Sequence, residues 1–365
     1  MKDKKIKKEI EKIEKEIVTS DINLVRLPIF HTVSKRGDKE QPLEIEHKRV
    51  VVEPDGTKKE MVIRVLSAGE YGLPKPPEIK VLNYFLWKWQ EAGRLDECKV
   101  YCTARDYFRS VGIENPSSKN YKQFKEQVMR LRLSGIIIKN GYRTKDGHYI
   151  SFEKPINILT DAMIFEREKD ASKGQQYFQF SYVVINPIII KSIKEKNIKL
   201  LRFDVISKLR GEIALLLYNH LELVMMDKVR YERDIVELAE DIGMTERETK
   251  EIKRKLNKAC QELKGKELTH GRITYIEVER SKDKSGWKLV IKKGKQRAES
   301  KEELMDERKR YLEIYKNLSE QEKAEVDRYV DEQIKNLSST AGNKYIESSE
   351  FLRDSLIIEY LQKKQ

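Results

Sequence analysis

Apolar residues recur at helical spacing in the stretch TERETKEIKRKLNKACQELKG, which runs from Thr245 to Gly265. Positions three and four apart share one face of a helix, and the apolar residues of this stretch follow that spacing. These apolar residues are Ile252, Leu256, Ala259 and Leu263. The roughly opposite face is basic and carries Arg247, Lys250, Arg254 and Lys258. The pattern predicts an amphipathic helix with a basic ridge, although an ordinary solvated surface helix would share it.

The flanking sequence predicts how this helix begins and ends. Thr245 is a favourable N-cap, and Glu248 three residues later can complete a capping box. Gly265 suits the position just after the last helical turn. Upstream, DIVELAEDIGM predicts a short helix that ends at Gly243. A short helix, a glycine turn and a basic helix form the helix-turn-helix pattern.

A β-hairpin is predicted after the basic helix. Residues 273–278 alternate like a strand, residues 282–286 have the composition of a turn, and residues 287–291 form a second strand. A helix-turn-helix followed by a hairpin is a winged-helix unit, and the hairpin is its wing.

The first half of the chain repeats this order. A helix beginning near Pro77 is followed by a short helix capped by Thr103, a turn at Gly112, and a basic helix capped by Ser117 or Ser118. Strands from residue 136 onward, with Asp146-Gly147 at a hairpin tip, complete the unit. Gly112 corresponds to Gly243. The chain therefore reads as two diverged copies of one unit, which is better support than either copy alone.

The remaining patterns predict further elements and set the boundaries between domains. In the N-terminal part we expect a helix in residues 1–18, a strand or extended segment in 21–33, and a hairpin from strands at 50–54 and 61–66. Strands at 156–168 and 177–186 are expected to extend the first unit's sheet. Further on, we expect a long apolar helix at 206–226 and helices at 299–338 and 344–363. The expected fold class is α+β: two tandem winged-helix domains with a helical C-terminal appendage. The domains are 1–20, a charged N-terminal helix; 21–190, the first winged-helix domain with N-terminal strands; 191–295, the second winged-helix domain; and 296–365, the appendage.

Composition narrows the class of partner. The chain has 365 residues, 37% of them charged, and a formal net charge of +13. Such a surplus favours a polyanionic partner, nucleic acid before an anionic membrane. No apolar run is long enough to span a bilayer, and the charged N-terminus lacks the apolar core of a signal peptide. A cytoplasmic protein is expected, and the three cysteines are expected to be buried thiols rather than zinc ligands.

The sequence lacks the patterns of several enzyme classes. Gly265-Lys266 has no upstream glycine and is followed by Glu267, so it is not a Walker motif. The five histidines are scattered singly, without the His-x-His pair of a metal-dependent nickase. No carboxylate cluster indicates a metal-dependent nuclease. We expect a binding protein with no catalytic residues, metal site or cofactor.

Three segments resemble the plasmid replication initiator protein A family. They are IRVLSAGEYGLPKPPEIKVLNYFLWKWQEAG, then TARDYFRSVGI with the basic helix up to Gly135, and then KLRGEIALLLYNHLEL. The likeness covers roughly residues 25–292. It implies tandem winged-helix domains that bind repeated double-stranded DNA sequences at a plasmid origin, help to open the origin and recruit a host initiator, helicase or primase. It also implies a homodimer, or a monomer–dimer equilibrium, through the first domain.

The candidate DNA-binding residues come from the two basic helices and the two predicted wings. We expect Arg254 or Arg247 to contact guanine, because a guanidinium can donate to two acceptors in the major groove. Lys250 and Lys258 are expected on phosphates. The full set is Lys119, Lys122, Gln123 and Arg130 on the first helix; Lys139, Arg143 and Lys145 on the first wing; Arg247, Lys250, Lys253, Arg254 and Lys258 on the second helix; and Arg280, Lys282, Lys284 and Lys288 on the second wing.

Two other functions stay open at this point. A transcription regulator can use the same fold without a role in replication, although two winged-helix units in one chain favour the initiator. A nuclease or nickase that starts replication by cutting DNA is the remaining alternative.

Overall fold

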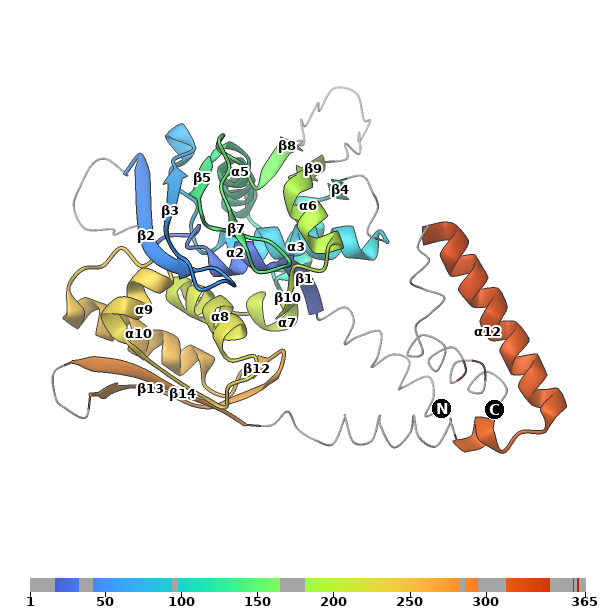
Figure 1. Cartoon of the computed structure of the whole chain (residues 1–365). Coiled ribbons are helices and arrows are strands. Elements are labelled where there is room, and N and C mark those ends of the chain that lie inside the picture. The colour runs from blue at the N-terminus through green and yellow to red at the C-terminus, as the bar shows by residue number, and fades with distance from the viewer. Residues whose placement is uncertain are drawn as a thin grey trace, which may run out of the picture. The chain divides into compact units, whose positions relative to one another are not determined.

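The structure is a computed structural model of the chain. It describes residues 17–32, 42–93, 98–164, 181–281, 286–294 and 313–341, together with residues 357 and 360. The chain divides into two compact units (Figure 1). Residues 11–294 form the main unit, and residues 295–365 group with residues 1–10 in the terminal unit. The fold class is α+β, as the sequence predicts.

The first winged-helix unit comprises three helices and a three-stranded antiparallel sheet. Its sheet has the strand order β4-β9-β8. The strand that precedes the second helix therefore pairs with the last strand of the unit. The elements are α3 (Glu78–Glu91), β4 (Lys99–Cys102), α4 (Ala104–Ser110), α5 (Ser118–Leu133), β8 (Leu159–Met163) and β9 (Ser181–Ile185).

The second winged-helix unit repeats this topology. Its antiparallel sheet has the order β11-β14-β13-β12, in which β11, β14 and β13 occupy the places of β4, β9 and β8. The helix α10 packs against β13 and against α8 (Figure 1). The elements are α8 (Glu212–Val224), β11 (Arg230–Asp234), α9 (Ile235–Asp241), α10 (Thr249–Leu263), β12 (Glu267–Leu268), β13 (Gly271–Arg280) and β14 (Trp287–Gly294).

Local sequence explains the helix starts and turns that the two units share. The Thr103 side chain accepts a hydrogen bond from the Asp106 backbone and caps α4, while Asp234 caps α9 in the same way. Ser117 and Asn120 form a capping box at the start of α5. The predictions of Thr103 and Ser117 as caps are confirmed.

The glycine turns of the two units have different requirements. Gly112 and Gly243 both have positive φ, 77° and 79°, a region that disfavours residues with a Cβ. At Gly112 an added Cβ would meet open space. At Gly243 it would lie 2.5 Å from the Phe30 carbonyl oxygen, so the second turn needs glycine for space as well.

A second sheet and a short hairpin are inserted into the first half of the chain. The sheet has the order β2-β3-β5, and its β2–β3 pair confirms the predicted N-terminal hairpin. The elements are β2 (Glu44–Val52), β3 (Lys58–Leu66), a 3-10 turn at Gly69–Tyr71, β5 (Ile136–Lys139), β6 (Tyr142–Arg143) and β7 (Tyr149–Ile150). The β6–β7 turn contains Asp146-Gly147, as predicted.

The connection between the two winged-helix units is paired with the N-terminal segment. The antiparallel pair β1–β10 joins residues 17–21 to residues 198–202. Asp21 caps the five-residue helix that follows β1. The elements are β1 (Ile17–Asp21), α2 (Ile22–Arg26), α6 (Pro187–Lys194), β10 (Ile198–Arg202) and α7 (Phe203–Ile206).

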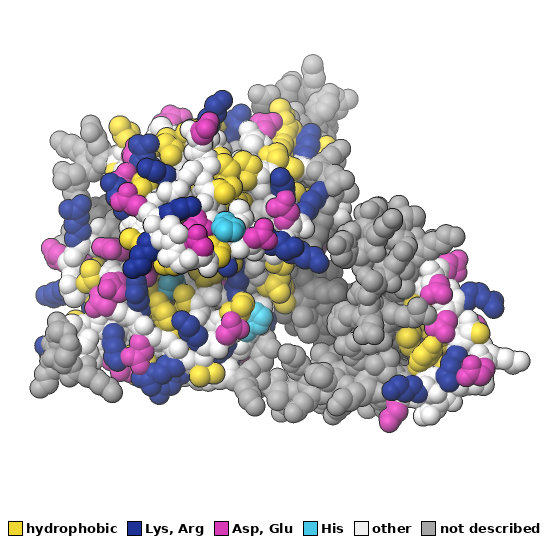
Figure 2. Space-filling model, in the orientation of Figure 1, with side chains coloured by type: hydrophobic (Ala, Val, Ile, Leu, Met, Phe, Trp, Pro, Cys, Tyr) yellow, Lys and Arg dark blue, Asp and Glu magenta, His cyan; other side chains and the backbone are white. Residues whose placement is uncertain are grey.

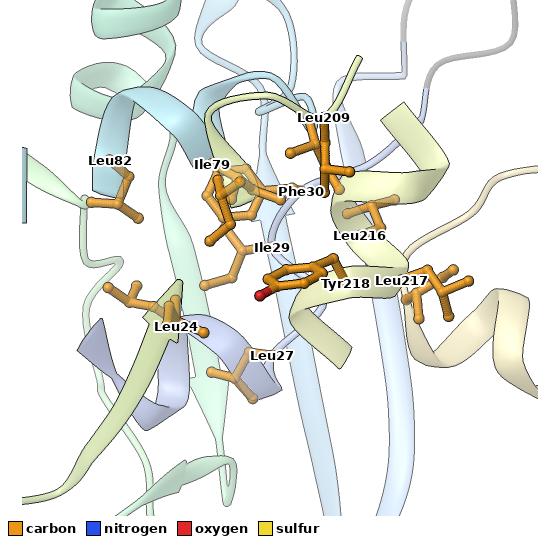
Figure 3. Packing of buried hydrophobic residues seen from close by; sticks show 14 of the residues in the cluster. Leu24, Leu27, Ile29, Phe30, Ile79, Leu82, Leu209, Leu216, Leu217 and Tyr218 are labelled. Atoms are coloured by element: carbon orange, nitrogen blue, oxygen red, sulfur yellow. The ribbon is translucent and has the colours of Figure 1, made fainter. Parts of the chain in front are cut away.

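One hydrophobic core runs through both winged-helix units. Ile29 and Phe30 of the N-terminal segment meet Ile79 of α3 and Leu216 of α8 (Figure 3). These side chains are 1–6% exposed. The Trp87 ring of α3 stacks on Phe203 of α7 at 5.8 Å between centroids. The units are therefore held together by buried apolar contacts, the main favourable contribution to folding.

The terminal unit has a small core of its own. Its helix α12 (Glu320–Ala341) carries Val326 and Val330, which are buried together with Ile357. The helix predicted at 299–338 is confirmed from residue 320 onward, and Val326 and Val330 lie four positions apart on its buried face. The side chains of Ile334 and Leu337 lie outside the described residues.

Three predictions of secondary structure are wrong at their edges. Residues 17–21 are a strand, so the N-terminal helix cannot reach residue 18, and residues 1–16 lie outside the described residues. Residues 22–26 are a helix capped by Asp21 rather than a strand. The apolar helix expected at 206–226 begins at Glu212, because residues 207–211 form a turn after α7.

Candidate nucleic-acid interface

The helix α10 presents its basic residues to solvent, as predicted. Its buried side chains are those of the apolar face, including Ile252, Leu256 and Leu263, which are 0–1% exposed. Lys250, Arg254 and Lys258 are exposed on the other side. The second helix of a helix-turn-helix is the one that enters the major groove, so these side chains have the position of a reading surface.

The start of α10 differs from the prediction. The helix begins at Thr249 with Glu248 as its N-cap, and no capping box with Thr245 forms. The Thr245 backbone instead donates a hydrogen bond to the Thr32 hydroxyl at 3.2 Å, and its own hydroxyl donates to the Thr32 carbonyl. Arg247 is exposed, but it precedes the helix and is not part of the basic ridge.

The turn before α10 is held by residues from the first half of the chain. The Thr32 hydroxyl also donates to Glu246 at 3.3 Å, and Glu246 pairs with Lys255 of α10. The Arg49 guanidinium of β2 donates to the Glu240 carbonyl and pairs with Asp241, both at 3.1 Å, at the end of α9. The first half of the chain therefore fixes the position of the second recognition helix.

Two of the candidate cations on α10 have intramolecular partners. Arg254 forms two hydrogen bonds with Glu251, at 2.9 and 2.6 Å, one turn away. Both residues lie near the surface, where such a pair contributes little to stability. Lys253 is half-buried, and its ammonium lies 2.9 Å from the centroid of the ring of Trp287, the first residue of the second wing strand.

The first recognition helix, α5, has a smaller basic surface. Lys119, Lys122 and Gln123 are exposed near its N-terminal end, as predicted. The prediction that Arg130 lies on the exposed side is wrong. Its side chain is 9% exposed, and its Nε and Nη2 atoms donate to the buried Glu78 carboxylate at 3.0 and 2.8 Å.

The Glu78–Arg130 pair is a structural link between α3 and α5. Arg130 also donates to the Tyr71 carbonyl at 3.2 Å, and the Lys75 backbone donates to Glu78. Burial raises the pKa of the Glu78 carboxyl to about 7, against the opposing effect of Arg130. A buried carboxylate needs this cation, so Arg130 is not available to DNA.

The first wing lies elsewhere than predicted. The strand β5 pairs with β3, and β6–β7 is a separate two-stranded hairpin. Because β8 and β9 occupy the places of β13 and β14 in the sheet order, they are the wing strands of the first unit. The connection between them, residues 165–180, lies outside the described residues.

The three residues expected on the first wing therefore lie on the inserted elements. Lys139 is exposed on β5, and Lys145 is exposed in the β6–β7 turn. Arg143 is held at the body: its backbone N–H donates to Asn23, and its carbonyl accepts from Asn23 and Asn197 at 2.7–3.0 Å. Assigning these residues to a wing was wrong, since the hairpin packs against the N-terminal segment.

The second wing is the β13–β14 hairpin, as predicted. Arg280 is exposed at the end of β13, while Lys282 and Lys284 lie outside the described residues. Lys288 is paired with Glu232 on the neighbouring strand β11, and its side chain is 18% exposed. It neutralises a carboxylate within the sheet and is a poor candidate for phosphate contact.

Surface charge by itself does not locate the interface. On the face shown in Figure 2, Lys and Arg side chains are interspersed with Asp and Glu side chains. The topology is therefore needed to identify the candidate recognition helices. None of the helices in the described ranges is both long and apolar enough to cross a membrane. The same part of the chain holds no group of three or more His, Cys, Asp or Glu side chains placed to bind a metal ion.

Sequence reasoning missed the contribution of Trp287. The sequence pattern places Trp287 after a predicted turn, at the start of a wing strand, and indicates no separate role for it. The sequence did contain a signal for the contact with Arg280, because pairing in the predicted hairpin places Trp287 opposite that residue. The contact with Lys253 depends on how α10 packs on the sheet and has no signal in the local sequence.

Comparisons with known proteins agree with this topology. Residues 66–222 match the family model described as "Initiator Replication protein, WH1". None of the curated proteins matches the chain significantly. A crystal structure of domains 2 and 3 of RctB, as a selenomethionine derivative, is similar with a TM-score of 0.50 and 14% identity, covering 75% of this chain and 98% of that one. A second structure of RctB domains 2–3 has a TM-score of 0.43 and 14% identity, covering 74% and 97%.

The structural similarity supports the tandem arrangement of the fold, because it extends over three-quarters of this chain. The family model matches the first unit and continues into α8 of the second. Residues 66–222 thus match the first winged-helix domain of initiator replication proteins, in agreement with the resemblance seen in the sequence.

Proposed function

We propose that this protein is a DNA-binding replication initiator that recognises repeated double-stranded sequences at an origin through both winged-helix units. The observation that carries the proposal is the pair of helix-turn-helix units in one chain, each with an exposed basic second helix. The match of residues 66–222 to an initiator domain favours replication over transcription control. The proposed activity is binding, with no catalytic residue, metal or cofactor.

The second unit is proposed to read bases. Residues 245–266 contain eight Lys or Arg and four Glu, so this segment carries a surplus of positive charge. With α10 in the major groove, Arg254 would exchange Glu251 for two acceptors on guanine, and Lys250 and Lys258 would lie on phosphates. Arg247, in the turn before α10, would contact the flanking backbone.

The first unit is proposed to supply fewer contacts. Lys119 and Lys122 on α5 would neutralise phosphates, and Gln123 could donate to and accept from adenine. Lys139 and Lys145 are exposed on the inserted strands and hairpin, where a phosphate contact would require DNA to extend beyond α5. We therefore expect the first unit to add affinity with less sequence discrimination.

We also propose self-association through the first half of the chain. The nine-residue strand β2 lies at an edge of the sheet β2-β3-β5. Val50 and Val52 are 67% and 54% exposed on it, and Leu43 just before it is 78% exposed. An edge strand with exposed apolar residues is a surface on which a second chain can pair. Val50→Lys should shift the protein toward monomer in analytical ultracentrifugation, whereas Val229→Lys, at a similarly exposed site in the second unit, should not.

Footprinting of the DNA that flanks the gene tests the main proposal. Several spaced protected repeats beside an AT-rich stretch are expected from an origin-binding initiator. A single protected palindrome would support the transcription regulator instead. Incubation of supercoiled plasmid carrying these repeats with the protein and Mg²⁺ or Mn²⁺ should leave it uncut, and metal-dependent nicking would overturn the assignment as a non-enzyme.

Recruitment of a host initiator, helicase or primase belongs to the same proposal. The terminal unit is the candidate surface, because it has a core separate from that of the DNA-binding units. Its removal is expected to leave binding to repeats while abolishing plasmid replication.

A further inference from the structure

Two cations from different DNA-facing elements lie against one aromatic ring. Trp287 is the first residue of β14 and pairs across the hairpin with Arg280, the last residue of β13. The Lys253 ammonium of α10 lies 2.9 Å from the centroid of the indole ring, and the Arg280 guanidinium lies 5.7 Å from it. The ring itself is half-buried and packs against the hydrophobic core.

We propose that Trp287 is a positioning residue of the DNA interface. It holds Lys253 and Arg280 in place, so that the recognition helix and the wing meet DNA in one fixed register. This inference rests on the proposed function and assigns to Trp287 a role that acts through the two cations, without requiring the ring to touch DNA.

Lys253 differs from the cations beside it on α10 in its partner. Arg254 and Lys255, its neighbours on α10, are paired with Glu251 and Glu246. Lys253 makes no ion pair within the described part of the chain. The negative face of an indole attracts a cation without cancelling its charge. Trp287 therefore orders Lys253 and leaves its full charge available to a phosphate.

Conformational entropy favours a lysine that is already held in place. A free lysine side chain loses rotamer freedom when it becomes fixed at an interface. A side chain that is already held against a ring has lost part of that freedom before binding. Tryptophan is the best of the aromatic residues for this purpose, because its ring attracts cations most strongly.

The Trp287 ring also links the recognition helix to the wing. Lys253 belongs to α10, whereas Arg280 and Trp287 belong to the wing. A contact from one ring to both elements limits their movement relative to each other. The spacing of phosphates along DNA is fixed, so holding the two elements at one separation favours one register over others.

The same sheet supplies a matched control. The Lys292 ammonium lies 5.2 Å from the ring of Tyr275, and these residues are on β14 and β13. That contact joins two wing strands and includes no cation from α10. Loss of the Tyr275 ring removes a similar contact without affecting Lys253.

A double-mutant cycle measures whether Trp287 acts through Lys253. The variants are Trp287→Leu, Lys253→Met and the double variant, with Trp287→Phe as the conservative change. Each full-length protein is tested for thermal unfolding and for binding to its footprinted repeat and to random DNA over a range of salt concentrations. Trp287→Phe keeps an aromatic ring and should fold even if Trp287→Leu does not. In that case the double-mutant cycle is measured with Trp287→Phe.

Trp287→Leu and Lys253→Met should each weaken binding to the repeat by about 3- to 10-fold, the range of a partly desolvated cation–π contact. The affinity of the double variant should lie within about twofold of that of the weaker-binding single variant. The reason is that both single changes remove the same interaction. Trp287→Phe should recover at least half of the loss on a logarithmic scale. Tyr275→Leu should bind within about twofold of the wild type.

Multiplicative losses in the double variant would overturn the proposal, since a merely structural tryptophan acts independently of Lys253. Equal losses in Tyr275→Leu would overturn it too. The proposed function fails separately: in that case the wild-type protein itself shows no preference for any flanking repeat over random DNA.

Discussion

The two winged-helix units have one topology and different surfaces. In the second unit, the outward face of the sheet β11-β14-β13 carries charged side chains with polar partners. Glu232 pairs with Arg230 and Lys288, and the Tyr275 hydroxyl donates to Glu279 at 2.6 Å and lies 3.1 Å from Glu277. In the first unit, the equivalent face holds Asp161, which pairs with Arg132 and accepts from the Tyr182 hydroxyl, and it also carries exposed aromatic and apolar side chains. Tyr101 is 61% exposed, Met163 is 44% exposed, and Lys99 lies 3.9 Å from the centroid of the Tyr182 ring.

The recognition helices also differ in how many of their basic side chains are exposed. The cations of α10 are mostly on its outer side, and those with carboxylate partners pair with residues of α10 or of the turn before it. On α5, Arg130 is buried and Arg132 pairs with Asp161 of the neighbouring strand β8. A repeated unit thus keeps its core positions while its exposed positions change, because burial restricts the former and solvent tolerates the latter.

Arg130→Met tests whether this arginine belongs to the core of the first unit. It leaves the buried Glu78 carboxylate without its cation, and the free energy of unfolding should fall by about 3–5 kcal/mol. The loss should be smaller at pH 5 than at pH 8, because burial raises the pKa of Glu78 to about 7 and a protonated carboxyl needs no partner. Urea unfolding at the two pH values measures both effects.

Lys122→Met is the matched control on the same helix and should change stability by less than about 0.5 kcal/mol. If Arg130→Met keeps wild-type stability and lowers DNA affinity, Arg130 contacts DNA, and its assignment to the core of the first unit is wrong.

Acid should destabilise the fold around two histidines in the first half of the chain. His31 and His47 share a 2.7 Å contact between their Nε2 atoms, and burial lowers their pKa values to about 3 and about 4. Unfolding frees these imidazoles to bind protons near pH 6.5, so this part of the stability is full above pH 6.5 and is lost as the pH falls toward 4. A shift of two pKa units in one group corresponds to about 3 kcal/mol.

The measurement is the difference in pH dependence between the wild type and His47→Gln in thermal unfolding from pH 7.5 to 4.5. A difference is required because burial raises the pKa values of the Asp21, Glu78 and Glu222 carboxyls, which act in the opposite direction. Equal pH dependence in the two proteins would show that the histidine pair contributes nothing to the acid sensitivity.

Arg254→Ala compares the two recognition helices directly. It should weaken binding to the cognate repeat by about 1–3 kcal/mol and relax the preference at one base pair. Lys119→Ala on α5 should cost less than about 1 kcal/mol and affect all sequences alike, as loss of a phosphate contact does. Binding to a library of single-base variants of the repeat separates the two outcomes. An effect on base preference from Lys119→Ala alone would reverse the roles assigned to the two helices.

The tip of the second wing should contribute to affinity without specificity. Replacing Lys282 and Lys284 with Ala should weaken binding to cognate and random DNA equally and reduce the slope of log affinity against log salt by up to about 2. Lys288→Ala is the contrasting variant, because its ammonium already pairs with Glu232, and it should leave the salt slope unchanged. A loss confined to the cognate repeat would place the lysines on base edges instead.

Truncation after Arg297 should have the smallest effect on DNA binding. The main unit ends at Gly294 and has its own core, so the shortened protein should unfold at nearly the same temperature and bind repeats within tenfold of the full chain, about 1.4 kcal/mol. Plasmid replication should nevertheless fail. A larger loss of affinity would show that the terminal unit contributes to DNA binding. The two winged-helix units would then not account for the affinity alone.

Local sequence patterns determined much of this protein. The apolar face of α10, the caps at Thr103 and Ser117, and the turns at Gly112 and Gly243 follow from spacing and backbone preference alone. The repeated order of these signals was enough to predict two winged-helix units. Each of these features depends on residues within a few positions of one another, which is the range over which sequence patterns carry information.

Tertiary structure decided which basic residues are available and which hairpin is the first wing. Arg130 looks like other lysines and arginines on α5 until Glu78, 52 positions earlier, is placed against it. The β6–β7 hairpin has a wing-like sequence, but strand pairing assigns the wing to β8 and β9. Thr245 is a good cap in isolation, yet its hydrogen bonds go to Thr32. In each case the outcome depends on a partner distant in sequence, and the energy of burying or pairing a polar group outweighs local preference.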